Sequence, residues 1–132
     1  MRHDTQWRSE YAIGVADVDH QHRHLMHLLG RAVELAATSH TKRLQRLLGE
    51  VEAYAADNFR TEEHLMRASR LPPAHVRLHI AAHSTFWRDL DRLEGRLQDG
   101  DDAVAPALEQ FLQRWLAGHI CGMDREMGHL LR

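Results

Sequence analysis

Apolar residues recur with the spacing of an α-helix over four long segments of this chain, at positions i, i+3, i+4 and i+7. The four segments are 18–37, 41–68, 74–97 and 103 to about 119. Short loops join them, and this favours an all-α fold: an antiparallel up-down-up-down four-helix bundle that forms one domain over residues 1–132. Residues 1–16 lack a clear period, and we expect them to form an extended N-terminal arm packed onto the bundle.

Local signals mark the ends of the predicted helices. Pro72 and Pro73 stop the second segment, because proline lacks an amide N–H and disfavours helix in the residue before it. The side chain of Asp17 or Asp19 is expected to cap the first helix, since a short carboxylate accepts the free N–H groups of a first turn. After the fourth helix, residues 125–132 are expected to form a short tail outside the bundle.

Polar residues interrupt the apolar face of every predicted helix. They are His22 on the first helix, Asn58 and Glu62 on the second, His79 and His83 on the third, and His119 and Asp124 on the fourth. These positions fall alternately near the start and near the end of successive helices, so an antiparallel bundle brings them to one end. Asp124 follows His119 by five residues, a spacing that an ideal α-helix does not align. We therefore expect a distorted last turn, eased by Gly118 and Gly122.

The residue types that gather there point to a metal site inside the bundle. A buried carboxylate such as Glu62 needs a compensating partner, and imidazole together with carboxylate suits iron or a similar first-row metal. Four histidines and two carboxylates are too many ligands for one tetrahedral zinc ion. They suit two ions roughly 3.5–4 Å apart that share the carboxylates. Asn58, one turn before Glu62, stands where the pattern calls for another histidine.

The other candidate ligands have simpler interpretations. Seven histidines are expected on outer faces or in loops, in contact with solvent: His3, His20, His24, His27, His40, His64 and His75. Glu126 and His129 match a Glu-x-x-His spacing, but di-iron carboxylate bundles need two such motifs and this chain has one. Cys121 is expected to be a small buried hydrophobic residue rather than a ligand.

Composition narrows the class of protein. Histidine is the outlier, with 12 in 132 residues, and the histidines are too dispersed to be a tag. The formal charge of -2 argues against a nucleic-acid partner, which would need a basic face. No apolar run approaches the ~18 residues of a membrane span, and residues 1–11 lack the apolar core of a signal peptide. The single cysteine fits a reducing compartment, so we expect a cytoplasmic protein with no membrane partner.

Four stretches of the chain together resemble the bacterial hemerythrins (bacteriohemerythrins), which are non-heme di-iron proteins that bind dioxygen. The stretches are DHQH at 19–22, NFRTEEHLM at 58–66, HIAAHSTF at 79–86 and WLAGHICGMD at 115–124, and Trp7 and Gly14 match the family's N-terminal arm. The resemblance covers essentially the whole chain. It implies that His79, His83 and His119 hold one iron and that His22 holds the other. Glu62 and Asp124 would bridge the two irons together with an oxo or hydroxo group.

Asn58 departs from the family's pattern, which usually has a histidine there, on the same iron as His22. The asparagine could bind this iron weakly through its amide oxygen, hydrogen-bond a bound water, or do neither. His64 lies six residues further on and faces elsewhere, so we do not expect it to substitute. The resemblance thus implies a di-iron site with one atypically open iron. We expect faster autoxidation than in an ordinary family member.

A binding or sensing protein, rather than an enzyme, is the function that these expectations favour. Its ligand would be dioxygen, its role that of an oxygen or redox sensor with low peroxidase-type reactivity, and its output a separate signalling protein. The wall around the site would be apolar: Leu25, Phe59, Phe86, Leu112 and Trp115. Two alternatives stay open: a di-iron enzyme that acts on peroxide or nitric oxide, and a single-metal or iron-storage protein.

Overall fold

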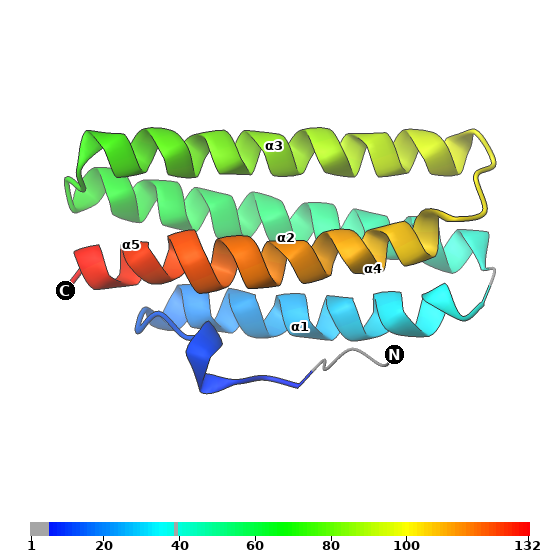
Figure 1. Ribbon diagram of the computed structural model, residues 1–132, viewed down its shortest axis with the longest axis horizontal. Helices are drawn as coiled ribbons and strands as arrows, with labels where there is room; N and C mark the ends of the chain where they lie inside the picture. Colours follow the sequence, from blue (N-terminus) through cyan, green and yellow to red (C-terminus); the bar gives the residue numbers. More distant parts are fainter. Residues whose placement is uncertain (1–5, 39) are drawn as a thin grey trace.

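Long helices lying side by side make up the molecule, which we describe from a computed structural model over residues 6–38 and 40–132 (Figure 1). In order, the elements are η1 (Ser9–Tyr11), α1 (Ala16–Ala36), α2 (Thr41–Ala68), α3 (Pro73–Gln98), α4 (Val104–Arg114), η2 (Trp115–Asp124) and α5 (Arg125–Leu130). The chain reverses direction between α1 and α2, between α2 and α3, and between α3 and α4 (Figure 1). The predicted all-α bundle is confirmed, and His3 falls outside the described residues.

The fourth helical run is longer than the sequence pattern indicates. The segment η2 is a π-helix that continues α4 without a break, and α5 continues η2 to Leu130. The expectation of a tail outside the bundle is wrong, because Met127 and Gly128 of α5 are buried. Met127 packs with Ile13 and Val18 in a small apolar cluster, which covers one end of the bundle. This is the end at which the predicted site lies.

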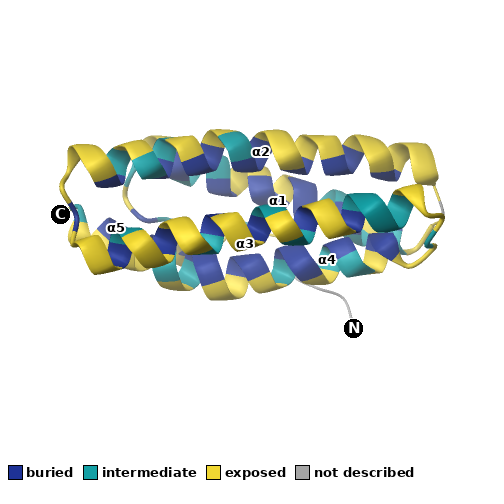
Figure 2. Ribbon diagram, turned by 90° about the horizontal axis from the view of Figure 1, so that it is seen from above, coloured by how far each residue is buried: buried dark blue, intermediate teal, exposed yellow. Residues whose placement is uncertain are grey.

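The apolar faces of the helices meet in one continuous core. Figure 2 shows the buried residues on the inner sides of the helices and the exposed ones on the outer sides. Leu25 and Leu29 of α1, Leu47 of α2 and Leu108 and Leu112 of α4 have no exposed surface. Burying each such side chain stabilises the fold by about 1.5–3 kcal/mol. The polar residues of the predicted site therefore sit in an otherwise apolar interior.

The N-terminal arm is bound to α1 by Asp19, which with Asp17 was one of the two residues expected to cap that helix. Its carboxylate instead accepts hydrogen bonds from the backbone N–H of Ile13, at 2.7 Å, and of Gly14, at 3.2 Å. Val15 occupies the N-cap position and makes no side-chain cap. Gly14 has a φ of +86°, which turns the arm back toward the helix. Asp19 therefore stabilises the junction of arm and helix rather than the free N–H groups of the first turn.

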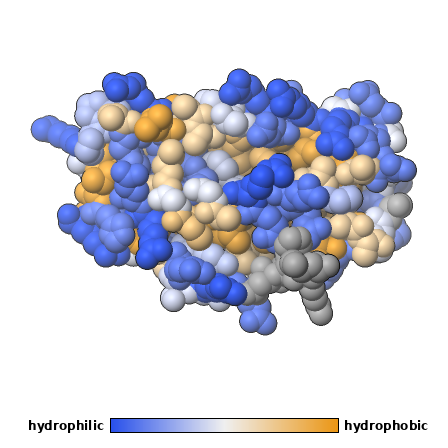
Figure 3. Space-filling model, viewed as in Figure 1, coloured by the Kyte–Doolittle hydropathy of each residue, from blue (hydrophilic) through white to orange (hydrophobic). Residues whose placement is uncertain are grey.

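Polar and charged side chains dominate the face of the molecule in Figure 3, and apolar ones are scattered among them. Leu78, Ile80 and Leu130 are the large hydrophobic side chains that are exposed within the described ranges. Over the same residues, no helix combines the length and the apolar character that crossing a membrane requires.

Candidate metal centre

The π-helix η2 is what aligns His119 with Asp124. A π-helix closes its hydrogen bonds between residues five apart, the same separation as that of these two residues. Nε2 of His119 consequently lies 3.0 Å from Oδ1 of Asp124. Gly118 and Gly122 lie inside this segment, where their lack of side chains eases the wider turn. The predicted distortion is thus confirmed.

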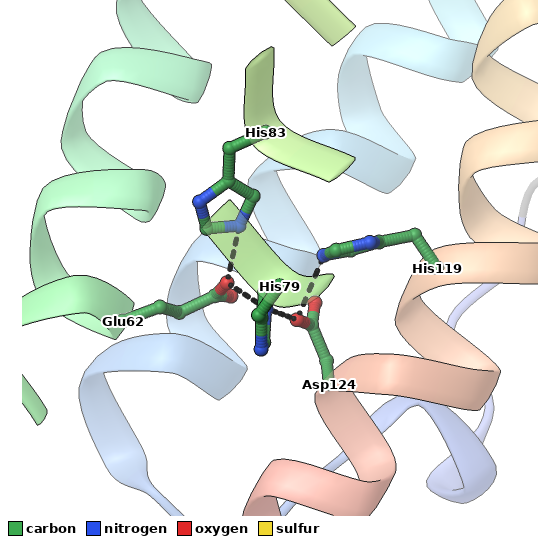
Figure 4. Close-up of side chains that lie close together, drawn as sticks. All are labelled: Glu62, His79, His83, His119 and Asp124. Carbon is green, nitrogen blue, oxygen red and sulfur yellow. Dashed lines mark hydrogen bonds and ion pairs between the residues drawn. The ribbon is translucent and has the colours of Figure 1, made fainter. Parts of the chain in front are cut away.

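Five predicted ligands converge from three elements of the bundle (Figure 4). They are Glu62 of α2, His79 and His83 of α3, and His119 and Asp124 of η2. Each offers one nitrogen or oxygen atom, these atoms all lie within 4.8 Å of one another, and all five residues are buried. Such a convergence of imidazole and carboxylate groups is typical of a metal site.

The carboxylate of Glu62 directs its two oxygens to opposite sides. Its Oε1 lies 3.1 Å from Nε2 of His79 and 3.1 Å from Nε2 of His83. Its Oε2 accepts a hydrogen bond from Nδ2 of Asn58 at 2.9 Å and lies 3.8 Å from Nε2 of His22. One oxygen therefore faces the histidines of α3, and the other faces α1.

Asp124 divides its oxygens in the same way. Its Oδ1 lies 2.9 Å from Nε2 of His79 and 3.0 Å from Nε2 of His119. Its Oδ2 lies 3.0 Å from Nε2 of His22. The structure thus places His22 across the two carboxylates from the other three histidines. One oxygen of each carboxylate therefore faces the three-histidine side, and the other faces the single imidazole of His22.

The donor atoms fit a metal ion. Nε2 of His119 is buried and has no hydrogen-bond partner among the described residues, although it lies close to Asp124. Buried polar atoms nearly always have a hydrogen-bond partner, whereas within the described residues this nitrogen has its close contact with Asp124 in place of one. A cation on the three-histidine side would satisfy this lone pair and offset two buried carboxylates that face the same point.

Hydrogen bonds on the far side of the rings fix the orientation of two of these histidines. Nδ1 of His22 lies 2.9 Å from the backbone oxygen of Tyr11, to which only an N–H can donate. Nδ1 of His83 lies 2.9 Å from Oε2 of Glu63. Both contacts direct Nε2 toward the cluster, and such contacts also raise the basicity of a ligating imidazole. The N-terminal arm therefore takes part in building the site through Tyr11.

His75 contradicts its predicted exposure to solvent. It is only 7% exposed, and its Nε2 lies 2.9 Å from Nδ1 of His79. It lies in the first turn of α3, which begins at Pro73, on the face that turns to the interior. Its position was recognisable in the sequence, because His75, His79 and His83 follow one another at intervals of four and so share one helical face. Glu63 carried no comparable signal.

The charges within the cluster balance one another even without a metal ion. Burial opposes a charge on His22, but the carboxylates of Asp124 and Glu62 outweigh it and raise the pKa of His22 to about 10. The same balance raises the pKa of His79 to about 9. Burial opposes the charge of Asp124 as well, yet close contacts with His119, His22 and His79 hold the pKa of Asp124 well below its usual value. Protons on imidazoles thus take the place of a metal's positive charge.

Aromatic side chains close the site on one side. The ring of Phe59 stacks on that of His83 with centroids 3.8 Å apart, and the ring of Trp115 stacks on that of His119 at 3.7 Å. Phe86 contacts both Phe59 and Trp115. Leu25 and Leu112, the other members of the predicted wall, are buried in the same core. These residues pack apolar and aromatic surface against His83 and His119.

Asn58 is buried, and hydrogen bonds engage both ends of its amide. The hydroxyl of Tyr54 donates to Oδ1 at 3.3 Å, while Nδ2 donates to Gln21 and to Glu62, each at 2.9 Å. Gln21 in turn donates to Thr61 at 2.9 Å. Burial and the charge of Glu62 raise the pKa of Tyr54 well above 10, so its hydroxyl keeps the proton that it donates.

Most of the remaining predictions for histidine and cysteine positions hold. The exposed histidines include His20, His24, His27, His40 and His64, as expected. Glu126 and His129 are exposed and lie outside the cluster. Cys121 is half-buried against the main core rather than fully buried.

Comparisons with known proteins agree with this arrangement. Residues 13–131 match the family model described as the hemerythrin HHE cation binding domain. The bacteriohemerythrin of Stenotrophomonas maltophilia is 29% identical over 121 residues, which cover 90% of this chain and 76% of that protein. Those of Ralstonia nicotianae and Methylococcus capsulatus are 27% and 24% identical, over 92% and 93% of this chain and 85% and 92% of their own lengths. The chain therefore belongs to the hemerythrin family.

Proposed function

We propose that this domain binds two iron ions and, through them, dioxygen. The observation that supports this most is the division of both carboxylates between two sides of the cluster. His79, His83 and His119 would hold one iron, and His22 would hold the other. Glu62 and Asp124 would bridge the two ions, each with one oxygen to either side. An oxo or hydroxo group would complete the bridge.

Bound iron would supply the redox chemistry that dioxygen binding needs, and the chain's own residues set the conditions for it. The aromatic side chains of Phe59, Phe86 and Trp115 pack around the three-histidine side and hold the rings of His83 and His119 in place. The backbone oxygen of Tyr11 and the carboxylate of Glu63 hold two imidazoles with Nε2 toward the metal positions. These are contacts that orient ligands before any ion enters.

Asn58 makes the two metal positions unequal. Its amide oxygen is engaged by Tyr54, and its nitrogen, which carries no lone pair for a metal, faces Glu62. We therefore assign Asn58 as a hydrogen-bond donor to a bridging carboxylate rather than as a ligand. The position beside His22 would have three protein ligands, while the position of the three histidines would have five. Water and small ligands would exchange more freely at the former.

An iron whose small ligands exchange freely favours sensing of oxygen or redox state over lasting oxygen storage. A sensor needs an output, so a separate signalling protein is part of the proposal, as is a cytoplasmic location. The missing imidazole also supports a second candidate, a domain that holds a single metal ion at the five-ligand position. A peroxide- or nitric-oxide-reducing enzyme would instead show steady turnover with an added reductant.

The experiment is to load the protein with iron(II) without oxygen, admit air, and follow the absorption spectrum. We expect visible charge-transfer bands to form on contact with air and to decline when oxygen is removed, before slow oxidation sets in. The matched control is Glu62→Gln, which removes a bridging carboxylate while keeping the side chain's size. A spectrum that air leaves unchanged would refute dioxygen binding.

A further inference from the structure

The buried ring of His75 lies outside the proposed ligand set. It occupies the first turn of α3, one helical turn before His79, and its ring meets that of His79 edge-on with centroids 5.0 Å apart. The hydrogen bond between Nε2 of His75 and Nδ1 of His79 is 2.9 Å long. His75 is thus a buried imidazole whose hydrogen bond goes to a proposed metal ligand, and packing alone does not explain this contact.

The direction of this hydrogen bond follows from what His79 faces on its other side. Nε2 of His79 points to Glu62 and Asp124 and would bind the metal there. With Nε2 bound to a metal, the ring's proton resides on Nδ1. The N–H at Nδ1 of His79 therefore donates, and Nε2 of His75 accepts.

His75 must then carry its own proton on Nδ1. That nitrogen lies 3.8 Å from Oε2 of Glu126, an exposed carboxylate on α5. Successive contacts therefore lead from the cluster to the surface, from His79 to His75 and from His75 to Glu126.

We propose that His75 is a positioning residue that fixes the tautomer of His79 and strengthens it as a metal ligand, with Glu126 orienting His75 from the surface. An acceptor at Nδ1 draws the proton away from the ring and so makes Nε2 a better electron donor to a cation. The inference rests on the proposed function, since it needs a metal at the three-histidine position. Of the three histidines on this face of α3, His79 and His83 would bind the metal and His75 would position His79.

The test compares two side chains of similar size at position 75. His75→Gln retains an oxygen that can accept from His79, whereas His75→Met offers only a weakly accepting sulfur. Zinc affinity, measured by competition with a chromophoric chelator, should fall about 10–100-fold in His75→Met. It should stay close to wild type in His75→Gln. His64→Met, at an exposed position of α2 away from the cluster, is the control and should bind zinc as wild type does.

A second readout separates positioning from simple packing. The iron-loaded His75→Met protein should have a higher reduction potential than wild type, because a less electron-rich His79 stabilises iron(III) less; His75→Gln should restore the wild-type value. Equal zinc affinity and equal potential in wild type and His75→Met would overturn the inference and leave the proposed function intact. Equal losses in the Met and Gln variants would also overturn it. A wild-type chain that binds neither zinc nor iron would refute the proposed function itself.

Discussion

The side-chain amide of Asn58 donates a hydrogen bond to Oε2 of Glu62 across 2.9 Å. The donor comes from one turn earlier on the same helix, α2, and it approaches the oxygen that faces His22. A histidine at this position would offer a lone pair to a metal, whereas the amide offers a proton to a carboxylate. This contact is the reason why the two proposed metal positions would be unequal.

Replacing Asn58 by histidine should make the second position a better metal site. The added imidazole would contribute a nitrogen donor beside His22, so the second ion should be held more tightly and the oxygenated protein should last longer in air. The measurement is the decay of the visible absorption after the iron(II) protein is mixed with air. Asn58→Leu, which removes the amide and adds no donor, should decay at least as fast as wild type. Equal lifetimes in wild type and Asn58→His would contradict our account of Asn58.

Glu62 and its neighbour Glu63 should differ sharply in their effect. Glu62→Gln leaves buried histidines without their carboxylate partner and removes a bridge, so we expect a loss of about 3–5 kcal/mol in the unfolding free energy of the metal-free protein. Glu63→Gln alters a half-exposed contact with His83 and should cost at most about 1 kcal/mol. Urea denaturation and metal analysis of both variants test this. Matching stabilities and matching metal contents would speak against Glu62 as a bridge.

The metal-free protein should lose stability in alkali. The pKa values of His22 and His79 in the folded chain, about 10 and about 9, lie above the value of 6.5 for an unperturbed histidine. The unfolded chain thus releases these protons first, and the stability that they contribute is full below pH 6.5 and is lost as the pH rises through 9 and 10. The melting temperature of chelator-treated protein should fall across this range. A melting temperature that is constant or rises from pH 7 to 10 would exclude these ion pairs.

Gly128 should tolerate no side chain, because the N-terminal arm lies directly on it. A Cβ at this position would come within 2.7 Å of the backbone oxygen of Ile13. Gly128→Ala should therefore destabilise the protein by about 1–3 kcal/mol. The displaced arm carries Tyr11, so the affinity for metal at the His22 position should fall with it.

The matched control for this substitution is Gly49→Ala, at an exposed position of α2 where a Cβ would meet nothing within 4 Å. Alanine is the better helix former by about 0.8–1 kcal/mol, so this variant should be slightly more stable than wild type. Guanidinium denaturation of both variants gives the comparison. If the two alanines have effects of the same sign, the contact between arm and α5 does not matter to stability.

The periodic part of the fold was open to prediction from the sequence. Helix α2 begins and ends where its apolar stripe and the two prolines indicate, and the spacing of His119 and Asp124 predicted the distorted turn that η2 provides. Both signals are local, because they depend on which residues share a helical face. The convergence of ligands at one end followed from combining these faces with antiparallel order.

Contacts between segments that lie far apart in the sequence could not be predicted from local spacing. Asp19 has the sequence position of a helix cap, but its carboxylate turns to the arm because Ile13 is anchored on Gly128 of α5. The short segment α5 was missed because six residues with a glycine show no helical period. His75 was misjudged because it was weighed alone, although its spacing from His79 and His83 placed it on the inner face. Tertiary contact, rather than propensity, decides the first two, whereas the spacing of His75 was a local signal.

The most direct test of the account is the number of iron ions per chain. Protein loaded with iron(II) under exclusion of oxygen, freed of unbound metal and analysed for iron and protein should contain two ions per chain. A chelator should then remove one of them readily and the other slowly, because the position beside His22 has fewer protein ligands. A chain that never holds more than one ion would contradict the bridged pair on which the proposed function depends.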